Sequence, residues 1–360
     1  MMAFAFQSRA QDPVFSQFYL NKNYLNPAYA GFSEDLQVGV NSRLQWSNVP
    51  GIFATNTFNA NIGCAPSRVG LAVMGYDHTE GEGFLRTQKA DMQVSVNLPG
   101  KFGRNWGKLA RKKFILSGGL GFGVGQKTID WSKLTFSDQL GHFEGELNQP
   151  SAINGFSERS NVIFDMSGGL RLQAAISEKG SYVSLGGAIF HLNRPVESFF
   201  GLDNRLEPRY TLHAFTYFQT KKFANKPSYL AVGMIMDKQQ GMMTNTIMVN
   251  QDVGSHGKFG IGFRRQNFIL IDKNVDALIL QTLFGFGNLT LGYSYDITIS
   301  SLGPQRTFGT HEIGITYTFG GFTLCGARSS GRKRKKSADD CFMLMSDINS
   351  NFRDLFLWNP

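Results

Sequence analysis

A repeated two-residue alternation of apolar and polar side chains constrains the fold most. It runs through Leu36–Trp46, Leu289–Tyr295 and Ile313–Phe319, and in the first of these segments only Ser42 interrupts the apolar set. A β-strand points successive side chains to opposite faces, so each segment has one apolar and one polar face. A soluble β-sandwich gives the same local pattern. Segments of about ten residues instead match the length of a tilted membrane-spanning strand.

About fourteen such segments follow one another, an even number as in bacterial outer-membrane barrels. The predicted strands lie at Asp35–Trp46, Ile52–Gly63, Arg68–Asp77, Thr87–Leu98, Lys112–Gln126, Val162–Ile176, Ser181–His191, Pro208–Gln219, Tyr229–Asp237, Met243–Asp252, Lys258–Arg265, Val275–Phe284, Asn288–Tyr295 and His311–Phe319. We therefore expect an all-β protein, a transmembrane antiparallel β-barrel of about 14 strands.

The composition agrees with a barrel and excludes helical membrane spans. No stretch approaches the roughly 20 consecutive apolar residues of a spanning helix. The chain is 13% aromatic, with 32 Phe and 41 Gly, which suits strands, tight turns and aromatic girdles. Its charged fraction of 18% is below the ~25% usual for soluble domains. A soluble α/β enzyme is therefore disfavoured.

The lengths of the connections predict which side of the membrane each one faces. With the N-terminus placed in the periplasm, the long connections all fall outside: Lys127–Asn161, Leu192–Glu207 and Asp296–Thr310. Several of the tightest fall inside: Cys64–Ser67, Ser177–Gly180 and Gly285–Gly287. Outer-membrane barrels have this asymmetry. Two inner connections, around Pro99–Arg111 and Thr220–Ser228, are longer than the pattern predicts.

The chain divides into four parts. Residues 1–10 resemble the tail of a signal peptide, residues 11–34 are expected as a periplasmic N-terminal segment, 35–319 as the outer-membrane barrel, and 320–360 as a basic and apolar periplasmic tail. Both termini are thus expected in the periplasm. The tail has three open roles: it plugs the lumen, packs beneath the barrel, or folds on a partner.

Positive charge gathers on the predicted inner side of this chain, whose net charge is +9. The basic residues of the tail are Arg332, Lys333, Arg334, Lys335 and Lys336. Such patches either contact lipid phosphates or dock an acidic periplasmic partner. Nucleic acid is not expected, since no recognition fold accompanies them.

Four aromatic residues are further candidates for partner binding. Phe352 and Trp358 lie in the apolar end of the tail. Phe199 and Phe200 lie in a long outer loop, where packing within the loop is the simpler explanation.

Signatures of catalysis, cofactor binding and metal binding are missing. None of the six histidines carries the local marks of a Ser–His hydrolase site, although His191, His213 and His311 lie in or beside predicted strands. The Gly-rich stretch Gly119–Gly123 lies inside a strand, so it is not a phosphate-binding loop; small residues passing crowded neighbours explain it better. We expect no enzyme activity, cofactor or metal.

The three cysteines are too few for a disulfide framework and do not have zinc-site spacing. A Cys64–Cys325 bridge, a Cys325–Cys341 bridge and reduced thiols all remain open.

The opening run of the chain resembles a known family. Gln11–Asn21 (QDPVFSQFYLN) and Tyr24–Gly31 (YLNPAYAG) are similar to the opening of the PorP/SprF family, outer-membrane proteins of type IX secretion and gliding motility. Parts of 191–214 and of 292–313 resemble its middle and C-terminal signatures. The residues that match family motifs are Asp12, Pro13, Phe15, Ser16, Gln17, Asn26, Pro27, Gly31, His213, His311 and Glu312. The resemblance covers Gln11 to Phe319.

This resemblance implies a non-enzymatic barrel that assists secretion or surface anchoring of exported proteins bearing type IX sorting domains. It also implies docking of periplasmic peptidoglycan-associated or secretion-system proteins, beside contact with outer-membrane lipid. A diffusion channel or hydrophobic-substrate transporter is the main alternative, and an outer-membrane lipid hydrolase is a weaker one. The aromatic opening run is expected to serve as a plug or brace at the barrel mouth, or else as a partner site.

Overall fold

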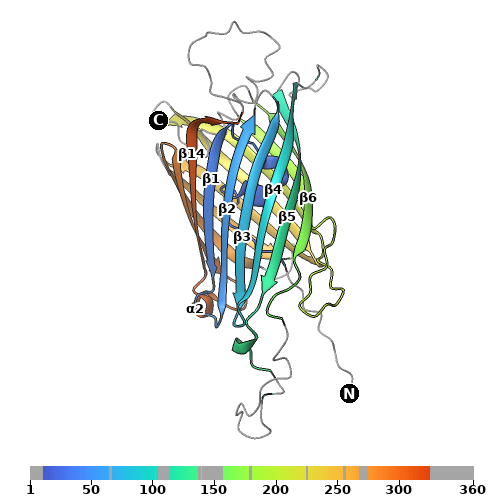
Figure 1. Ribbon diagram of the computed structural model, residues 1–360. Coiled ribbons are helices and arrows are strands. Elements are labelled where there is room, and N and C mark those ends of the chain that lie inside the picture. Colours follow the sequence, from blue (N-terminus) through green and yellow to red (C-terminus); the bar gives the residue numbers. More distant parts are fainter. Residues whose placement is uncertain are drawn as a thin grey trace.

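In the computed structural model the chain closes into a barrel of fourteen antiparallel strands (Figure 1), which confirms the predicted fold class. The structure describes residues 11–64, 67–101, 103, 113–136, 139, 157–177, 181–223, 226–253, 257–266 and 275–324. Within these ranges no helix has the length and apolar character needed to cross a membrane.

The strands follow one another around the barrel in sequence order. They are β1 (Asp35–Gln45), β2 (Ile52–Cys64), β3 (Val69–Gly81), β4 (Leu85–Lys101), β5 (Lys113–Thr128), β6 (Ile163–Ala175), β7 (Tyr182–Phe190), β8 (Arg209–Phe223), β9 (Lys226–Gln239), β10 (Met242–Val253), β11 (Gly257–Gln266), β12 (Val275–Phe286), β13 (Leu289–Thr298) and β14 (Thr310–Thr323). Short helical turns lie at α1 (Lys22–Leu25), η1 (Pro27–Tyr29), η3 (Trp131–Lys133) and α2 (Pro304–Thr307).

The first and last strands close the barrel by pairing with each other. In this seam Val40 lies opposite Ile315 and Arg43 opposite Glu312. Closure leaves no strand edge without hydrogen-bond partners, as a wall in lipid requires. The rim where β1 begins and β14 ends is called here the short-turn rim. The opposite rim, which carries the connections 129–162 and 191–208, is the long-loop rim.

Several strand boundaries differ from the sequence prediction. β8 and β9 continue to Phe223 and from Lys226, so the expected inner connection Thr220–Ser228 contains only residues 224–225 outside the strands. The basic residues there break the apolar alternation, but backbone pairing continues past a bulge after Gln219. β14 likewise extends to Thr323, four residues beyond the predicted Phe319.

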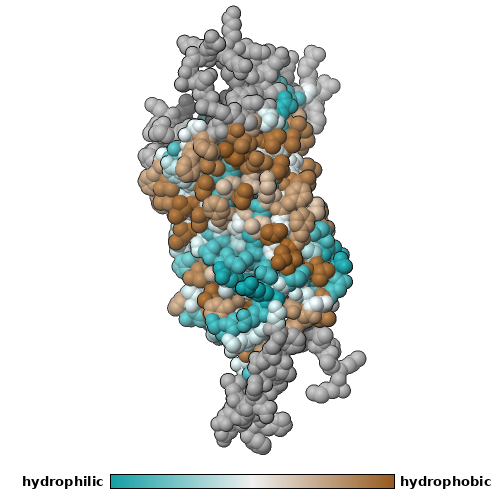
Figure 2. Space-filling model, in the orientation of Figure 1, coloured by the Kyte–Doolittle hydropathy of each residue, from teal (hydrophilic) through white to brown (hydrophobic). Residues whose placement is uncertain are grey.

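Apolar side chains form a belt on the outer wall. On β5 the outward residues Leu116, Leu120, Phe122 and Val124 are all exposed. Figure 2 shows apolar residues gathered over the half of the barrel nearer the short-turn rim, with polar residues toward the long-loop rim. Exposure of this much apolar surface is expected where lipid, not water, surrounds the wall.

Arginine placed in this belt should strongly destabilise the barrel. For Leu120→Arg we expect a loss of roughly 2–4 kcal/mol, the cost of a cation near the bilayer midplane. The matched change Gln88→Arg, nearer the long-loop rim, should cost about 0–1 kcal/mol because it faces the membrane interface. Reversible urea unfolding in lipid vesicles measures both values. Equal costs would contradict the placement of the belt in the membrane.

Cys64, the last residue of β2, is buried at the short-turn rim and is disulfide-bonded. Its partner lies outside the described residues. The alternative in which Cys64 remains a free thiol is therefore excluded.

Candidate functional site

Residues 11–34, called here the lumen segment, lie inside the barrel. Ser16, Gln17, Asn26 and Ala28 are fully buried, and η1 contacts β4, β5 and β6. Figure 1 shows the two short helical turns of this segment within the barrel wall. The segment expected to act as a plug or brace at the barrel mouth thus lies inside the barrel.

The lumen segment runs from one rim to the other. Asp12 contacts His191, which directly follows β7, and Arg209, which begins β8, at the long-loop rim. Gly31 packs against Gly70 at the short-turn rim, close to the start of β1. The first and last described residues therefore lie at opposite rims. The expectation that both termini face the periplasm concerns residues 1–10 and 325–360, which lie outside the described residues.

Glycines in the wall make room for the lumen segment. A Cβ atom on Gly119 would lie 2.4 Å from the carbonyl carbon of Pro27, and one on Gly169 would lie 2.1 Å from Oδ1 of Asn26. Further inward glycines that closely face the segment are Gly63, Gly70, Gly233, Gly292 and Gly314. The segment and the wall are therefore fitted to each other at these glycines.

Four charged side chains from four strands meet in the lumen. Arg43 on β1 lies 3.0 Å from both Asp296 on β13 and Glu312 on β14. Arg264 on β11 lies 2.9 Å from Asp296. All four are at most 5% exposed, so two positive and two negative charges neutralise one another out of water.

The lumen segment docks on these carboxylates through its own backbone. The N–H groups of Ser16 and Gln17 donate to the two carboxylate oxygens of Glu312, at 2.8 and 3.0 Å. The hydroxyl of Ser16 donates to Asp296 at 2.7 Å. Hydrogen bonds to charged acceptors are among the stronger ones in proteins. Three of the family-motif residues, Ser16, Gln17 and Glu312, thus meet in one contact between segment and wall.

A second ionic cluster holds the start of the segment at the long-loop rim. His191 places Nε2 2.9 Å from Asp12 and Nδ1 2.8 Å from Asp165. Arg209 lies 3.1 Å from the same oxygen of Asp12, and Lys89 pairs with Asp165. A cavity of about 40 Å³ lies beside Asp12 and His191. We call these five residues the latch.

The charges of the latch shift its protonation equilibria. Burial acts to raise the pKa of Asp12, but the charges of His191 and Arg209 outweigh it, so this pKa lies far below its usual range. Burial acts to lower the pKa of His191, but the Asp12 and Asp165 carboxylates outweigh it and raise this pKa. The contribution of Asp12 is thus lost only in strong acid. That of His191 is present below its unfolded pKa of about 6.5 and is lost as the pH rises through the raised value.

The start of the lumen segment should therefore loosen as the pH rises. Backbone amides of residues 11–16 should be better protected at about pH 6 than at about pH 9, once intrinsic exchange rates are corrected for. Hydrogen–deuterium exchange with mass spectrometry measures this difference. His191→Gln should remove it, whereas His311→Gln, on the outer wall, should keep it. Equal protection at both pH values in the unmodified chain would contradict the role of His191.

The middle of the lumen segment is fixed by Asn26. Its side-chain amide donates to the carbonyls of Leu170 and Gly187, at 3.0 and 3.1 Å. Its Oδ1 accepts from the N–H of Ala28 and so caps η1. His213 lies 3.2 Å from the same amide and stacks on Phe215, which is a packing role and not that of a catalytic base.

The structure brings most of the family-motif residues together in the lumen. The motif residues there are Asp12, Pro13, Phe15, Ser16, Gln17, Asn26, Pro27, Gly31, His213 and Glu312. His311 does not join them: it lies on the outer wall, where the Tyr293 hydroxyl is 2.9 Å from its Nδ1.

The aromatic candidates of the long outer loop pack within the loops and remain partly exposed. The rings of Phe199 and Phe200 lie 5.9 and 5.7 Å from that of Trp131. Phe200 is 47% exposed, so it still presents a surface to a partner. The remaining candidates, Arg332, Lys333, Arg334, Lys335, Lys336, Phe352 and Trp358, lie outside the described residues.

Sequence reasoning missed the charged residues of the lumen. Arg43, Arg264, Asp296, Lys89 and Asp165 were not singled out, although each occupies the polar phase of its strand. A charged residue at a polar position of the alternation was the feature that could have indicated them. Such a position does not distinguish a residue that faces water from one that is buried. In the part of the chain that the structure covers, no group of three or more His, Cys, Asp or Glu side chains is arranged for a metal ion.

Comparison with known proteins finds one matching family and several solved structures with low similarity. The family described as "Type IX secretion system membrane protein PorP/SprF" matches residues 7–317. No curated protein matches the sequence. Among solved structures, the chain is similar to a TodX deltaS2S3 mutant monoaromatic hydrocarbon channel (9% identity, 81% of this chain and 91% of that chain, TM-score 0.42). It is also similar to a Pseudomonas aeruginosa FadL homologue (12% identity, 83% and 94%, TM-score 0.36). These similarities are too low to say anything about ligands.

Proposed function

The chain belongs to the PorP/SprF family of type IX secretion system membrane proteins, and from this we propose that it is a non-enzymatic component that assists secretion or surface anchoring of exported proteins. The lumen segment is the observation that carries this proposal. A barrel whose lumen is crossed from rim to rim by its own chain is expected to offer cargo no path, so we expect its work to fall to the surfaces at its two rims and in its wall. The cargo would be proteins that bear type IX sorting domains, in secretion or in gliding motility.

The long-loop rim is proposed to face the cell exterior, as in barrels whose long loops are extracellular. Trp131, Phe199 and Phe200 would then offer an aromatic surface to exported protein. Partly exposed aromatic residues are the side chains most often found at the energetic centre of protein interfaces.

The short-turn rim is proposed to face the periplasm. β14 ends there at Thr323, and the residues that follow are proposed to leave the wall on that side. The basic run Arg332–Lys336 would attract an acidic peptidoglycan-associated or secretion-system protein, and Phe352 and Trp358 would be covered in that complex.

Deleting Arg328–Pro360 should separate docking from folding. We expect the truncated barrel to insert and to stay heat-modifiable on gels, while recovery of periplasmic partners from native membranes falls at least about fivefold, as loss of an ionic anchor implies. A second variant, with Arg332–Lys336 all changed to Gln, keeps both C-terminal cysteines and should show the same loss. If the truncated chain fails to insert, or if partner recovery is unchanged, the tail is not a docking element.

The two rival functions meet specific obstacles. A diffusion channel or hydrophobic-substrate transporter needs a passage that the lumen segment occupies. A lipid hydrolase needs a histidine base beside a nucleophile. Both ring nitrogens of His191 instead face carboxylates, and Nε2 of His213 faces the side-chain amide of Asn26. Esterase activity that is lost on changing either histidine to alanine would support the hydrolase hypothesis instead.

A further inference from the structure

The outer wall of the barrel has a hollow between β2 and β5, with a volume of about 670 Å³. Its floor consists of two small outward residues that lie opposite each other on neighbouring strands, Gly75 and Ala90. Phe58 lies beside Gly75 on one flank, and Val124 beside Ala90 on the other. Both flanking side chains are exposed, so the hollow opens sideways into the membrane and not into the lumen. Its size is within the ~300–1,000 Å³ of small-molecule sites.

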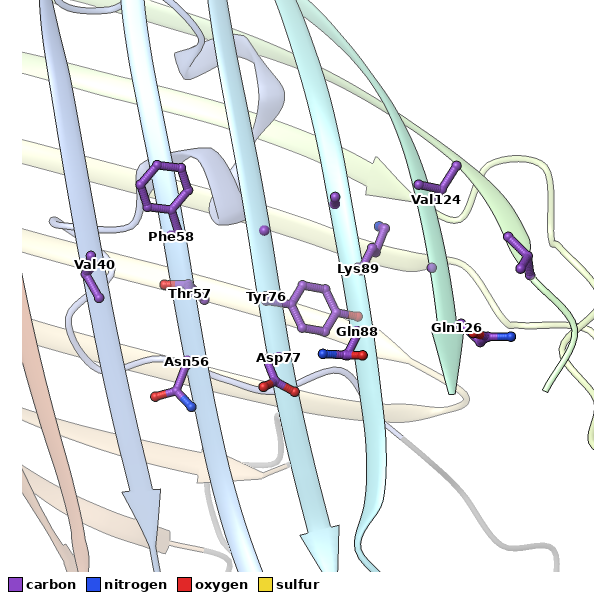
Figure 3. A pocket seen from close by; sticks show the side chains of 14 residues that line it. Val40, Asn56, Thr57, Phe58, Tyr76, Asp77, Gln88, Lys89, Val124 and Gln126 are labelled. Atoms are coloured by element: carbon purple, nitrogen blue, oxygen red, sulfur yellow. The ribbon is translucent and has the colours of Figure 1, made fainter. Parts of the chain in front are cut away.

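A row of polar side chains bounds the hollow on the side of the long-loop rim. Asn56, Asp77, Gln88 and Gln126 lie opposite one another in register, one row beyond the small residues. Figure 3 shows these four side chains level with one another across β2 to β5, with Phe58 and Val124 above them. Toward the short-turn rim, the next row on β3 and β4 consists of Val73 and Met92, both exposed.

Part of the polar row is held in place by the wall itself. Asp77 accepts two hydrogen bonds from Arg86, at 2.7 and 2.6 Å. Asn56 accepts one from Ser42 at 2.7 Å, and Gln126 donates to the carbonyl of Ser160 at 2.9 Å. Gln88, in the middle of the row, is exposed. The row therefore offers fixed amide and carboxylate groups along the edge of an apolar hollow.

We propose that this hollow binds one membrane lipid, with its headgroup toward the long-loop rim. The acyl chain would lie over Gly75 and Ala90 between Phe58 and Val124. The headgroup would hydrogen-bond to Gln88 and its neighbours. A molecule that fits must be apolar toward the belt and polar toward the rim, and it must reach the site from within the bilayer. A membrane lipid has this chemistry and orientation, whereas a water-soluble ligand cannot approach through the belt.

A photoreactive lipid tests the proposal on the full chain. Phosphatidylethanolamine with a diazirine in one acyl chain is incorporated into vesicles of the same lipid, and the adducts are mapped by mass spectrometry. In the unmodified chain we expect Val73, Met92 and Val124 to carry at least fivefold more label, relative to their exposure, than belt residues on the opposite wall. Ala90→Leu fills the floor and should abolish this excess.

Two matched variants separate a bound lipid from the general lipid shell. Ala60→Leu enlarges another outward alanine on β2 outside the hollow and should leave the labelling unchanged. Gln88→Leu should lower the preference for phosphatidylethanolamine over phosphatidylcholine, which lacks an ammonium donor, at least threefold in competition. Labelling that only follows exposure, or that survives Ala90→Leu, would overturn the proposal. So would a membrane protein, instead of lipid, cross-linked at Met92 in native membranes.

Discussion

Deletion of residues 11–31 is expected to convert the closed barrel into an ion-conducting pore. The strand-to-strand hydrogen bonds of the wall do not involve the lumen segment, so the shell can still close. Fourteen strands enclose more space than inward side chains alone can fill. The lumen would take up water around residues such as Arg43 and Glu312. Planar bilayer recordings should show a conductance like that of a porin for the deletion variant and none for the unmodified chain.

A pair of neighbouring glycines controls for damage to the wall. Gly119→Leu should displace η1, because even a Cβ atom there would lie 2.4 Å from Pro27, and it should give partial conductance or a loosened lumen segment. Gly118 faces outward, where the nearest atom to an added Cβ is 3.5 Å away, so Gly118→Leu should give no conductance. Conductance in the unmodified chain, or a folded deletion variant without conductance, would show that the lumen segment is not the barrier.

Arg43→Met should destabilise the barrel by roughly 3–5 kcal/mol, the cost of removing one partner from a buried ion pair. Arg43 is 1% exposed and is shared between Asp296 and Glu312. Without it, two carboxylates face Arg264 alone, and the lumen segment loses part of the charge pattern that positions Ser16. The destabilised state should also release residues 11–31 to proteases more readily.

Arg86→Met provides the matched control. Arg86 also binds a carboxylate, that of Asp77, at 2.6 Å, but on the outer wall, where the two side chains are 48% and 32% exposed. Removal of an exposed pair of this kind costs about 0–1 kcal/mol. Urea unfolding of both variants in the same vesicles compares them directly. Similar losses for the two arginines would mean that the lumen is hydrated and that burial does not strengthen the Arg43 contacts.

The strands could be predicted from the sequence, whereas the position of the lumen segment and its contacts could not. Alternation fixes which residues of Leu36–Trp46 face outward, because the period of a strand is two residues. The lumen segment has no such period: its aromatic and polar residues are ordered by contacts with many strands. Arg43 and Asp296 meet although 253 residues separate them, and only closure of the barrel brings them together. The carboxylates of the lumen therefore gave no local signal.

The latch residues illustrate the same limit. Asp12 stood out by family resemblance, but its partners His191 and Arg209 lie directly after β7 and at the start of β8. The sequence places His191 at the end of a strand and in a family signature, without indicating its partners. His191 can hold Asp12 only because residues 11–34 cross the lumen before β1 begins. No pattern within a strand can indicate this course of the chain.

The docking of the lumen segment on β14 also constrains how the protein is made. Ser16 and Gln17 are translated almost 300 residues before Glu312, the carboxylate that their N–H groups bind, since 296 positions separate Ser16 from it. Until β14 arrives, this part of the segment lacks its acceptor, and β1 lacks its neighbour in the seam. One strand therefore completes both the wall and its contents. Sealing and filling become a single late event in biogenesis, and a chain truncated before β14 can achieve neither.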